Sequence, residues 1–248
     1  MSGLLQAAEP KTLRFGVEAS YEPFEYKTPS GELAGFDIDI GNLVCRKLKV
    51  RCVWVESTLD GLIPSLISRK FDAINSDLTI TSQRLKIVDF TDPIYSVQNK
   101  LIARNDSQLA PEAVALKGKR IGVLQGSIQE TFALKRWAPA GARIESYQTQ
   151  ELAYEDLKNG RLDATFQEAE AGATGFLGKP YAREFGFKGD AVEDRDTLGG
   201  GTGFAVRKSD LRLKAQLNQA LRELKQDGTI GRLASKYFTV PVKVEASP

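Results

Sequence analysis

Two rounds of alternating strand-like and helix-like segments run along this chain. The first round passes from the strand-like "TLRFGVEA" through the helical "GFDIDIGNLVCRKLKV" to the strand-like "CVWVES". The second begins at Lys119 with "KRIGVLQG" and continues through the helical "SIQETFALKRW". Alternation of this kind is typical of a parallel sheet with helices on both faces. We therefore predict an α/β fold, and 248 residues suffice for one large domain or two smaller ones.

A short pattern occurs in both rounds. "ISRKFDAINSD" and "LKNGRLDATFQE" each read as a helix end, a basic residue, an apolar residue, Asp, Ala and a strand. This faint internal similarity indicates two comparable α/β lobes. Two stretches resemble connections between them: an extended run at 95–105, and "DTLGGGTGFAVRK", whose glycines at 199–201 allow unusual backbone angles.

Composition excludes several classes of function. The chain has no histidine, which excludes Ser-His-Asp and Cys-His catalysis and every His-ligated metal site. Two cysteines and one methionine argue against a thiolate or iron–sulfur site. The net charge of +2 is too small for a nucleic-acid surface. No apolar run approaches the roughly 20 residues that a membrane span needs. We therefore expect no metal, no cofactor and no nucleic-acid partner.

The two cysteines lie close together, in "LVCRKLKVRCVW". Cys45 and Cys52 are either two buried free thiols or one local disulfide, because a helix-to-strand turn can bring the Cα atoms within about 4.4–6.8 Å. A disulfide would indicate an oxidising compartment. The N-terminal "MSGLLQAAEP" has the small residues of a signal cleavage site without the basic and long apolar parts. It fits a remnant in front of a mature exported chain whose signal peptide has been removed.

Polar side chains crowd the stretch "NSDLTITS", where six of eight residues can form side-chain hydrogen bonds. Arg84 follows two positions later, and Thr81 is a plausible N-cap, so Arg84 lies in the first turn of a helix. A cation there opposes the helix dipole. Either Arg84 pairs with Asp89 or Asp92 at the surface, or it reaches over a cleft and holds a carboxylate by two parallel hydrogen bonds.

Further candidates follow other predicted strands. Ser127 opens a helix with the S-x-x-E spacing of a capping box, and free N–H groups at such a helix start can bind an anion. No nucleotide is expected, because neither a dinucleotide fingerprint nor a P-loop is present. Glu168 and Glu170 follow a strand at the sheet edge where α/β folds bind ligands, and either could hold an ammonium group or be a solvated acid. Glu18 and Tyr21 follow the first strand and, by spacing alone, a loop acid and a loop tyrosine are more often ordinary loop residues than functional ones.

Ordered motifs across residues 11–240 resemble the periplasmic amino-acid-binding proteins of bacterial ABC importers (solute-binding protein family 3). The likeness is strongest to the lysine/arginine/ornithine- and histidine-binding branch. The motifs include "GFDIDIGNLVCRKLKV", "DGLIPSLISRKFDA", "GVLQGS", "GTGFAVRK" and "LRELKQDGTI". The resemblance implies a type II fold, in which two Rossmann-like lobes joined by two hinge strands close on a ligand.

The resemblance also implies limits for the lobes and a cellular setting. It implies the disulfide Cys45–Cys52, a periplasmic location, a monomer, and a membrane ABC permease as partner. The expected limits are residues 11–95 with 197–240 for lobe 1, 100–192 for lobe 2, and tails at 1–10 and 241–248.

Site roles carry over position by position. Arg84 would bind the α-carboxylate of the ligand together with the backbone N–H of Ile128. Thr79 would contact the head group, and Glu168 would hold the α-ammonium group. Positions that line or cap the side-chain pocket would be Tyr21, Leu59, Ser76, Leu124, Ser127 and Gln129.

Five of the positions depart from the pattern of the branch. Glu18 and Glu168 each stand where the branch has an aspartate, and Asp77 replaces a serine. Leu59 replaces an aromatic residue that stacks on the ligand, and Ile128 replaces a threonine. Each exchange of Asp for Glu moves a carboxylate by one methylene group, and the loss of the ring at position 59 opens space.

The departures give the predicted pocket one cation, Arg84, against the carboxylates of Glu18, Asp77 and Glu168. A zwitterionic head group would leave buried acid unpaired unless the ligand brings positive charge or a proton is taken up. We predict a binding protein for a cationic amino acid of the arginine, lysine or ornithine type, or for a derivative such as an opine. Two alternatives stay open: a cyclohexadienyl dehydratase-like enzyme using Glu168 or Glu170 as its acid, and a sensory ligand-binding domain.

Overall fold

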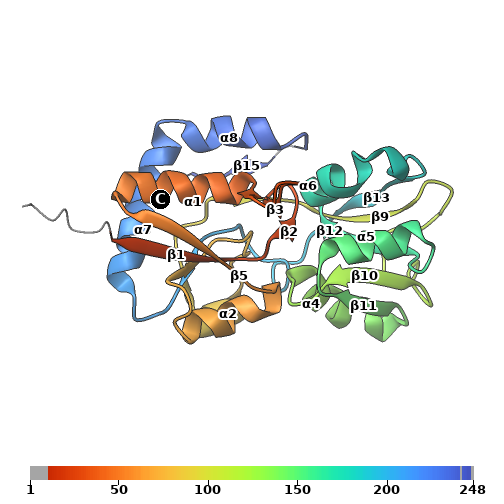
Figure 1. Cartoon of the computed structure of the whole chain (residues 1–248). Coiled ribbons are helices and arrows are strands. Elements are labelled where there is room, and N and C mark those ends of the chain that lie inside the picture. The colour runs from red at the N-terminus through yellow and green to blue at the C-terminus, as the bar shows by residue number, and fades with distance from the viewer. Residues whose placement is uncertain (1–10, 241, 247–248) are drawn as a thin grey trace, which may run out of the picture.

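Two five-stranded sheets form two lobes that lie side by side (Figure 1). The computed structural model describes residues 11–240 and 242–246. The predicted N-terminal remnant at 1–10 therefore lies outside the described residues. Within them, no helix has the length and apolar character required to cross a membrane.

In the first lobe the strand order is β5-β1-β6-β14-β7. β1 pairs in parallel with β5 and β6, whereas β14 runs antiparallel to β6 and β7. Helices α1, α7 and α8 lie on one side of this sheet and α2 on the other (Figure 1). The bounds are β1 (Thr12–Val17), β5 (Arg51–Glu56), β6 (Ala73–Ile74), β7 (Asp89–Phe90), β14 (Ala205–Val206), α1 (Phe36–Leu48), α2 (Leu59–Ile67), α3 (Ser82–Ile87), α7 (Leu211–Gln226) and α8 (Thr229–Tyr237).

The second lobe repeats this plan with the order β11-β10-β12-β9-β13. β10 pairs in parallel with β11 and β12, and β9 runs antiparallel to β12 and β13. Its strands are β9 (Asn99–Arg104), β10 (Arg120–Leu124), β11 (Arg143–Tyr147), β12 (Ala164–Glu168) and β13 (Phe185–Val192). Its helices are α4 (Ile128–Arg136), α5 (Gln150–Lys158), α6 (Ala169–Ala171), η1 (Ala138–Ala140), η2 (Gly172–Leu177) and η3 (Pro180–Ala182).

Two small sheets complete the fold. One contains β2, β3 and β4, and the other pairs β8 with β15. Their bounds are β2 (Ser20–Tyr21), β3 (Glu25–Lys27), β4 (Leu33–Ala34), β8 (Tyr95–Ser96) and β15 (Lys243–Val244).

The prediction of two α/β lobes is confirmed, but parallel pairing is confined to three adjacent strands at one side of each sheet, β5-β1-β6 and β11-β10-β12. The chain reaches β9 when it leaves the first lobe and reaches β14 when it returns. Each of these strands enters its sheet against the direction of the three parallel strands. The lobe limits, 11–95 with 197–240 and 100–192, stay a prediction.

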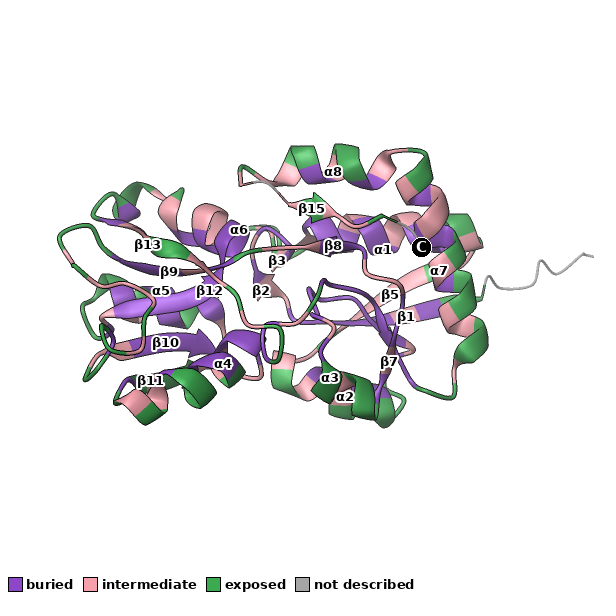
Figure 2. Cartoon of the chain, turned by 180° about the vertical axis from the view of Figure 1, so that it is seen from behind, coloured by how far each residue is buried: buried purple, intermediate pink, exposed green. Residues whose placement is uncertain are grey.

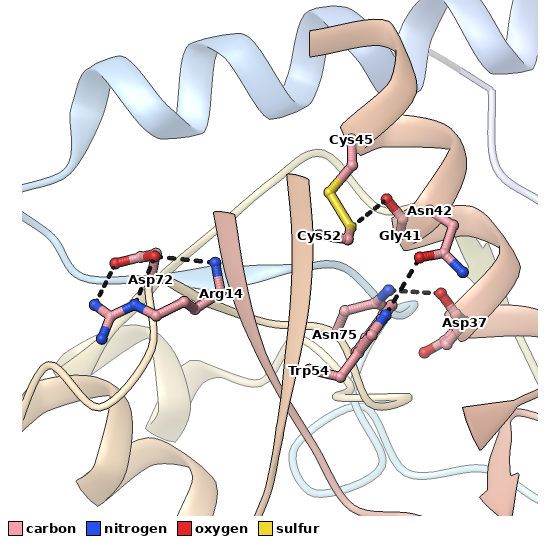
Figure 3. The surroundings of a disulfide bond; sticks show 9 residues. All are labelled: Arg14, Asp37, Gly41, Asn42, Cys45, Cys52, Trp54, Asp72 and Asn75. Carbon is pink, nitrogen blue, oxygen red and sulfur yellow. Dashed lines mark hydrogen bonds and ion pairs between the residues drawn. A yellow bond between two sulfur atoms is a disulfide. The ribbon is translucent and has the colours of Figure 1, made fainter. Parts of the chain in front are cut away.

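The aspartate in each copy of the internal sequence pattern makes the same contact in its own lobe. Asp72 Oδ2 accepts a hydrogen bond of 3.0 Å from the backbone N–H of Arg14 (Figure 3), and Asp163 Oδ2 accepts one of 2.8 Å from that of Arg120. Each arginine also places its guanidinium on the same carboxylate. The same residue pair therefore joins the first and third strands of both rounds.

Apolar side chains cover both faces of each sheet, so the inner strands are largely buried (Figure 2). In the first lobe one face packs around Phe15 and Phe204, and the other packs around Phe71. In the second lobe Trp137 packs on one face and Phe176 on the other. A sheet buried on both faces positions the ends of its strands rigidly, and those ends carry the site described below.

A disulfide joins Cys45 near the end of α1 to Cys52 in β5, with Cα atoms 5.7 Å apart (Figure 3). The predicted disulfide is therefore present. Beside it, Asn75 Nδ2 donates a 2.7 Å hydrogen bond to the backbone carbonyl of Asp37, which ties the end of β6 to the first turn of α1.

Candidate ligand-binding site

One cavity lies between the lobes and gathers the predicted site residues. Its free volume is only about 20 Å³. All twelve predicted ligand-binding residues line it, and they come from both lobes. The lining residues are Glu18, Tyr21, Glu25, Leu59, Ser76, Asp77, Thr79, Arg84, Leu124, Ser127, Ile128, Gln129 and Glu168. Among the lining residues, Glu25 is the one that the sequence analysis missed.

The lobes contact each other directly around this cavity. Between residues of the described ranges, four hydrogen bonds or ion pairs cross from one lobe to the other, so the structure shows a closed arrangement. They are Arg84 Nη2 to Gly126 O (3.1 Å), Gln125 Nε2 to Asp60 Oδ2 (2.7 Å), Glu168 N to Tyr21 Oη (3.3 Å), and Lys179 Nζ to Glu22 Oε2 (2.7 Å).

Arg84 is positioned by the helix start that the sequence predicts. Thr81 Oγ1 accepts a 3.2 Å hydrogen bond from the backbone N–H of Arg84, which confirms Thr81 as the N-cap of α3. The guanidinium bends back and donates from Nη1 to the carbonyl of Thr79 at 2.9 Å. Burial lowers the pKa of Arg84 to about 10, and the negative charges of Glu168 and Asp77 partly offset that effect.

The alternative role of Arg84 as a surface arginine is wrong. Asp89 is bound by Lys214 at 3.0 Å, and Asp92 by Arg222 at 3.3 Å. Both candidate partners are therefore held by other cations, and Arg84 lines the cavity instead.

The start of α4 faces Arg84 from the second lobe. Ser127 Oγ accepts from the backbone N–H of Glu130 at 3.0 Å, as a capping box requires. The Glu130 carboxylate accepts at 2.7 Å from the N–H of Gly126, one residue before the expected one. Among the described residues, the N–H of Ile128 has no acceptor, and Ile128 lines the cavity. An N–H donor and the Arg84 guanidinium therefore border the same cavity.

In the first lobe, two buried carboxyl groups lie within hydrogen-bond distance of one buried phenol, whose single proton cannot serve both of them. Tyr95 Oη lies 2.9 Å from Asp37 Oδ1 and 3.0 Å from Asp77 Oδ1. A phenol carries one proton, so it can donate to only one of the two carboxylates. The other carboxyl group must itself be protonated and donate to Tyr95. Burial raises the pKa of Asp37 to about 8, and the charge of Asp77 contributes to the rise.

The remaining acids of the cavity are also buried. Glu168 is 2% exposed, and burial, followed by the charge of Asp77, raises its pKa well above the ordinary value. Burial also raises the pKa of Glu18, although its carboxylate accepts hydrogen bonds from Ser20. Glu25 Oε1 accepts a 2.9 Å hydrogen bond from Ser76 Oγ, and Glu25 Oε2 has no partner among the described residues.

A hairpin interpretation of "SYEPFEY" would have found Glu25. In the structure Tyr21 on β2 is the cross-strand partner of Glu25 on β3. Directly opposite residues of an antiparallel pair lie on the same face. Since Tyr21 was a predicted site residue, that pairing would have placed Glu25 beside it.

Glu170 does not line the cavity, so it is not placed to hold a ligand's ammonium group there. It is not a solvated acid either, because it is 1% exposed and neither carboxylate oxygen has a partner among the described residues. Burial raises its pKa to about 8.

We expect the ligand-free protein to lose stability as the pH rises. The folded-state pKa values of Asp37 and Glu170, both about 8, lie above their unfolded values. Their contribution is therefore fully present below the unfolded pKa and is lost as the pH rises through about 8, by up to about 1.4 kcal/mol per pH unit for each group. Melting temperatures between pH 5 and 9 should fall. Glu170→Gln should reduce the fall, and Glu112→Gln, at an exposed position, should not. A flat profile for the unmodified protein would contradict the expectation.

Comparison with known proteins agrees with this geometry. Bacterial extracellular solute-binding proteins, family 3, match residues 13–240. The chain belongs to this family. It is 46% identical over 236 residues to the histidine-binding periplasmic protein of Salmonella typhimurium, covering 95% of this chain and 91% of that protein. It is also 46% identical over 232 residues to the lysine/arginine/ornithine-binding periplasmic protein of Escherichia coli, covering 94% and 89%.

A solved structure of another binding protein has the same fold as this family 3 protein. A periplasmic binding protein of Salmonella typhimurium described by its high arginine specificity superposes with a TM-score of 0.86 at 30% identity, over 92% of this chain and all of that one. The predicted family, two-lobe fold and extracytoplasmic location are confirmed. The relatives are binding proteins by name.

Proposed function

We propose that this protein captures a cationic amino acid of the arginine, lysine or ornithine type between its lobes and delivers it to a membrane ABC permease. One observation carries the proposal. The closed cavity holds one cation, Arg84, against the buried carboxyl groups of Glu18, Asp77 and Glu168. A ligand with one negative and two positive charges complements that arrangement.

The carboxylate of the ligand would lie between Arg84 and the start of α4. A guanidinium has five N–H donors. Among the described residues, Arg84 uses two of them, on the carbonyls of Thr79 and Gly126. Its remaining donors and the N–H of Ile128 suit a carboxylate, because charge-assisted hydrogen bonds in parallel give both strength and geometry.

The α-ammonium group would lie near Glu168 and Asp77; burial, followed by the charge of Asp77, raises the pKa of Glu168. A neutral amino acid would satisfy Arg84 and only part of this negative charge. Buried charge without a partner is strongly unfavourable, so a second positive charge on the ligand, near Glu18, is favoured.

Delivery to a permease is supported by membership of the family and by the closed two-lobe arrangement. We propose a monomeric binding protein rather than an enzyme, since the relatives described above are binding proteins. Hinge closure around a ligand suits capture and handover.

A thermal-shift screen on protein refolded to remove carried-over ligand tests the proposal. Arginine, lysine, ornithine and histidine would be compared with glutamine and citrulline. At about 100 times its dissociation constant a ligand adds roughly 2.7 kcal/mol of stability, which corresponds to a shift of several degrees. We expect the cationic amino acids to stabilise and the neutral ones not to. Equal stabilisation by glutamine, or turnover of prephenate or arogenate, would contradict the proposal.

A further inference from the structure

Glu25 is a buried acid of the cavity that has no cationic partner in the part of the chain that the structure describes. It is 2% exposed, and Ser76 Oγ holds only one of its two carboxylate oxygens. Its Oε2 is buried and has no hydrogen-bond partner among the described residues. Leaving an ionised oxygen in this state is costly, so the carboxyl group requires either a proton or a cation.

A hydrogen-bonded serine connects Glu25 to Glu18, near which the proposed function places the second positive charge of the ligand. Ser76 Oγ accepts a 2.9 Å hydrogen bond from the backbone N–H of Glu18 and donates one of 2.9 Å to Glu25. Arg84 makes its own contacts elsewhere, with Thr79 and Gly126. Ser76 therefore ties Glu25 to the backbone of Glu18, away from the contacts of Arg84.

We propose that Glu25 determines specificity by holding a proton in the ligand-free protein and exchanging that proton for the distal cation of the ligand. The proton leaves the Glu25 carboxyl group for bulk water as the ligand's ammonium or guanidinium group takes its place, so charge balances without any redox step. The inference rests on the proposed function and adds to it a specificity residue and a released proton.

The groups that face Glu25 support this exchange. Burial is the largest cause of its raised pKa, and the charges of Asp37 on α1, Asp77 after β6 and Glu18 after β1 add to it. Only the hydrogen bond from Ser76 acts in the opposite direction. The nearby aromatic hydroxyl groups, on Tyr21 and Tyr95, have pKa values raised well above the ordinary one, so they stay neutral and supply no positive charge.

Isothermal titration calorimetry at pH 7 in two buffers of different ionisation enthalpy tests the exchange. We expect arginine to release up to about one proton from Glu25 and to bind more tightly as the pH rises from 6 to 8, by up to about tenfold per pH unit. Citrulline, with the same shape and no distal charge, should release less. Arginine binding by the unmodified protein without proton release over this range would overturn the inference, with no variant needed.

Glu25→Gln sharpens the test because it keeps the hydrogen bond from Ser76 and removes the charge. Arginine affinity should fall about 10- to 100-fold, the size of a lost charge-assisted hydrogen bond, and citrulline affinity should change by less than about threefold. Proton release with arginine should also fall. Glu170→Gln is the matched control: it is equally buried, lies outside the cavity, and should leave all three readouts unchanged.

The titrations distinguish a wrong inference about Glu25 from a wrong proposed function. If Glu25→Gln leaves both the arginine-to-citrulline ratio and the proton release unchanged, Glu25 has no such role, while arginine binding itself still stands. If the unmodified protein prefers citrulline to arginine, the proposed function is wrong, and the inference about Glu25 fails with it.

Discussion

Arg84→Ala should weaken arginine binding by roughly 30- to 5,000-fold, the equivalent of about 2–5 kcal/mol for truncating one partner of a buried, hydrogen-bonded charge pair. The guanidinium is the one cation among the cavity-lining residues, and its loss also removes the contact with Gly126 across the lobes. Isothermal titration calorimetry on refolded protein would measure the loss.

Two variants serve as controls for Arg84→Ala. Arg84→Lys keeps the charge but loses the paired donors, so an intermediate affinity is expected. Arg222→Ala removes an arginine that pairs with Asp92 away from the cavity and should leave affinity unchanged. Arginine binding by Arg84→Ala within threefold of the unmodified protein would show that the ligand carboxylate lies elsewhere.

Gly126→Ala should impair closure of the lobes more than it impairs folding. Gly126 has a φ of +79°, and an added Cβ would lie 2.9 Å from the backbone N and Cα of Asp60 in the other lobe. That overlap exists only when the lobes are closed. Overpacking of this kind costs about 1–3 kcal/mol, so arginine affinity should fall about 5- to 150-fold. Small-angle X-ray scattering with saturating arginine should report a larger radius of gyration than for the unmodified protein.

Gly160→Ala separates closure from backbone strain. Gly160 also has a positive φ, +71°, but its added Cβ would meet nothing within 4 Å. It should lose a comparable amount of stability from the left-handed backbone and bind arginine normally. Equal affinities for the two glycine variants would show that the contact between Gly126 and Asp60 does not limit closure.

The sequence predicts the lobes and most of the cavity for one physical reason. Candidates such as Glu18, Arg84 and Glu168 follow buried strands, and the ends of neighbouring parallel strands meet at one edge of a sheet. The resemblance to a family then adds Leu59 and Gln129, which spacing alone would not select. Strand direction was harder to predict, because β9 and β14 owe theirs to the path of the chain between the lobes.

The residues that were missed depend on contacts between distant segments. Asp37, in "GFDIDI", reads as an ordinary acid in the first turn of a helix, a favourable place for negative charge. Only the folded chain brings it to Tyr95 and, through Tyr95, to Asp77. Glu25 likewise needs the pairing of β2 with β3 to reach the cavity. Local sequence patterns do not contain that information.

Asp77 also joins the cavity to both segments that cross between the lobes. Its Oδ1 is within 3.0 Å of Tyr95 Oη, on the outgoing segment, and accepts a 2.9 Å hydrogen bond from Thr202 Oγ1, on the returning one. The two segments are themselves joined by the N–H of Thr202, which donates to Tyr95 O at 2.7 Å. Fastened together in this way, they cannot swivel independently. The connection between the lobes is therefore hydrogen-bonded to a side chain that lines the cavity, so a change at the cavity and a movement of the lobes would act on the same carboxylate.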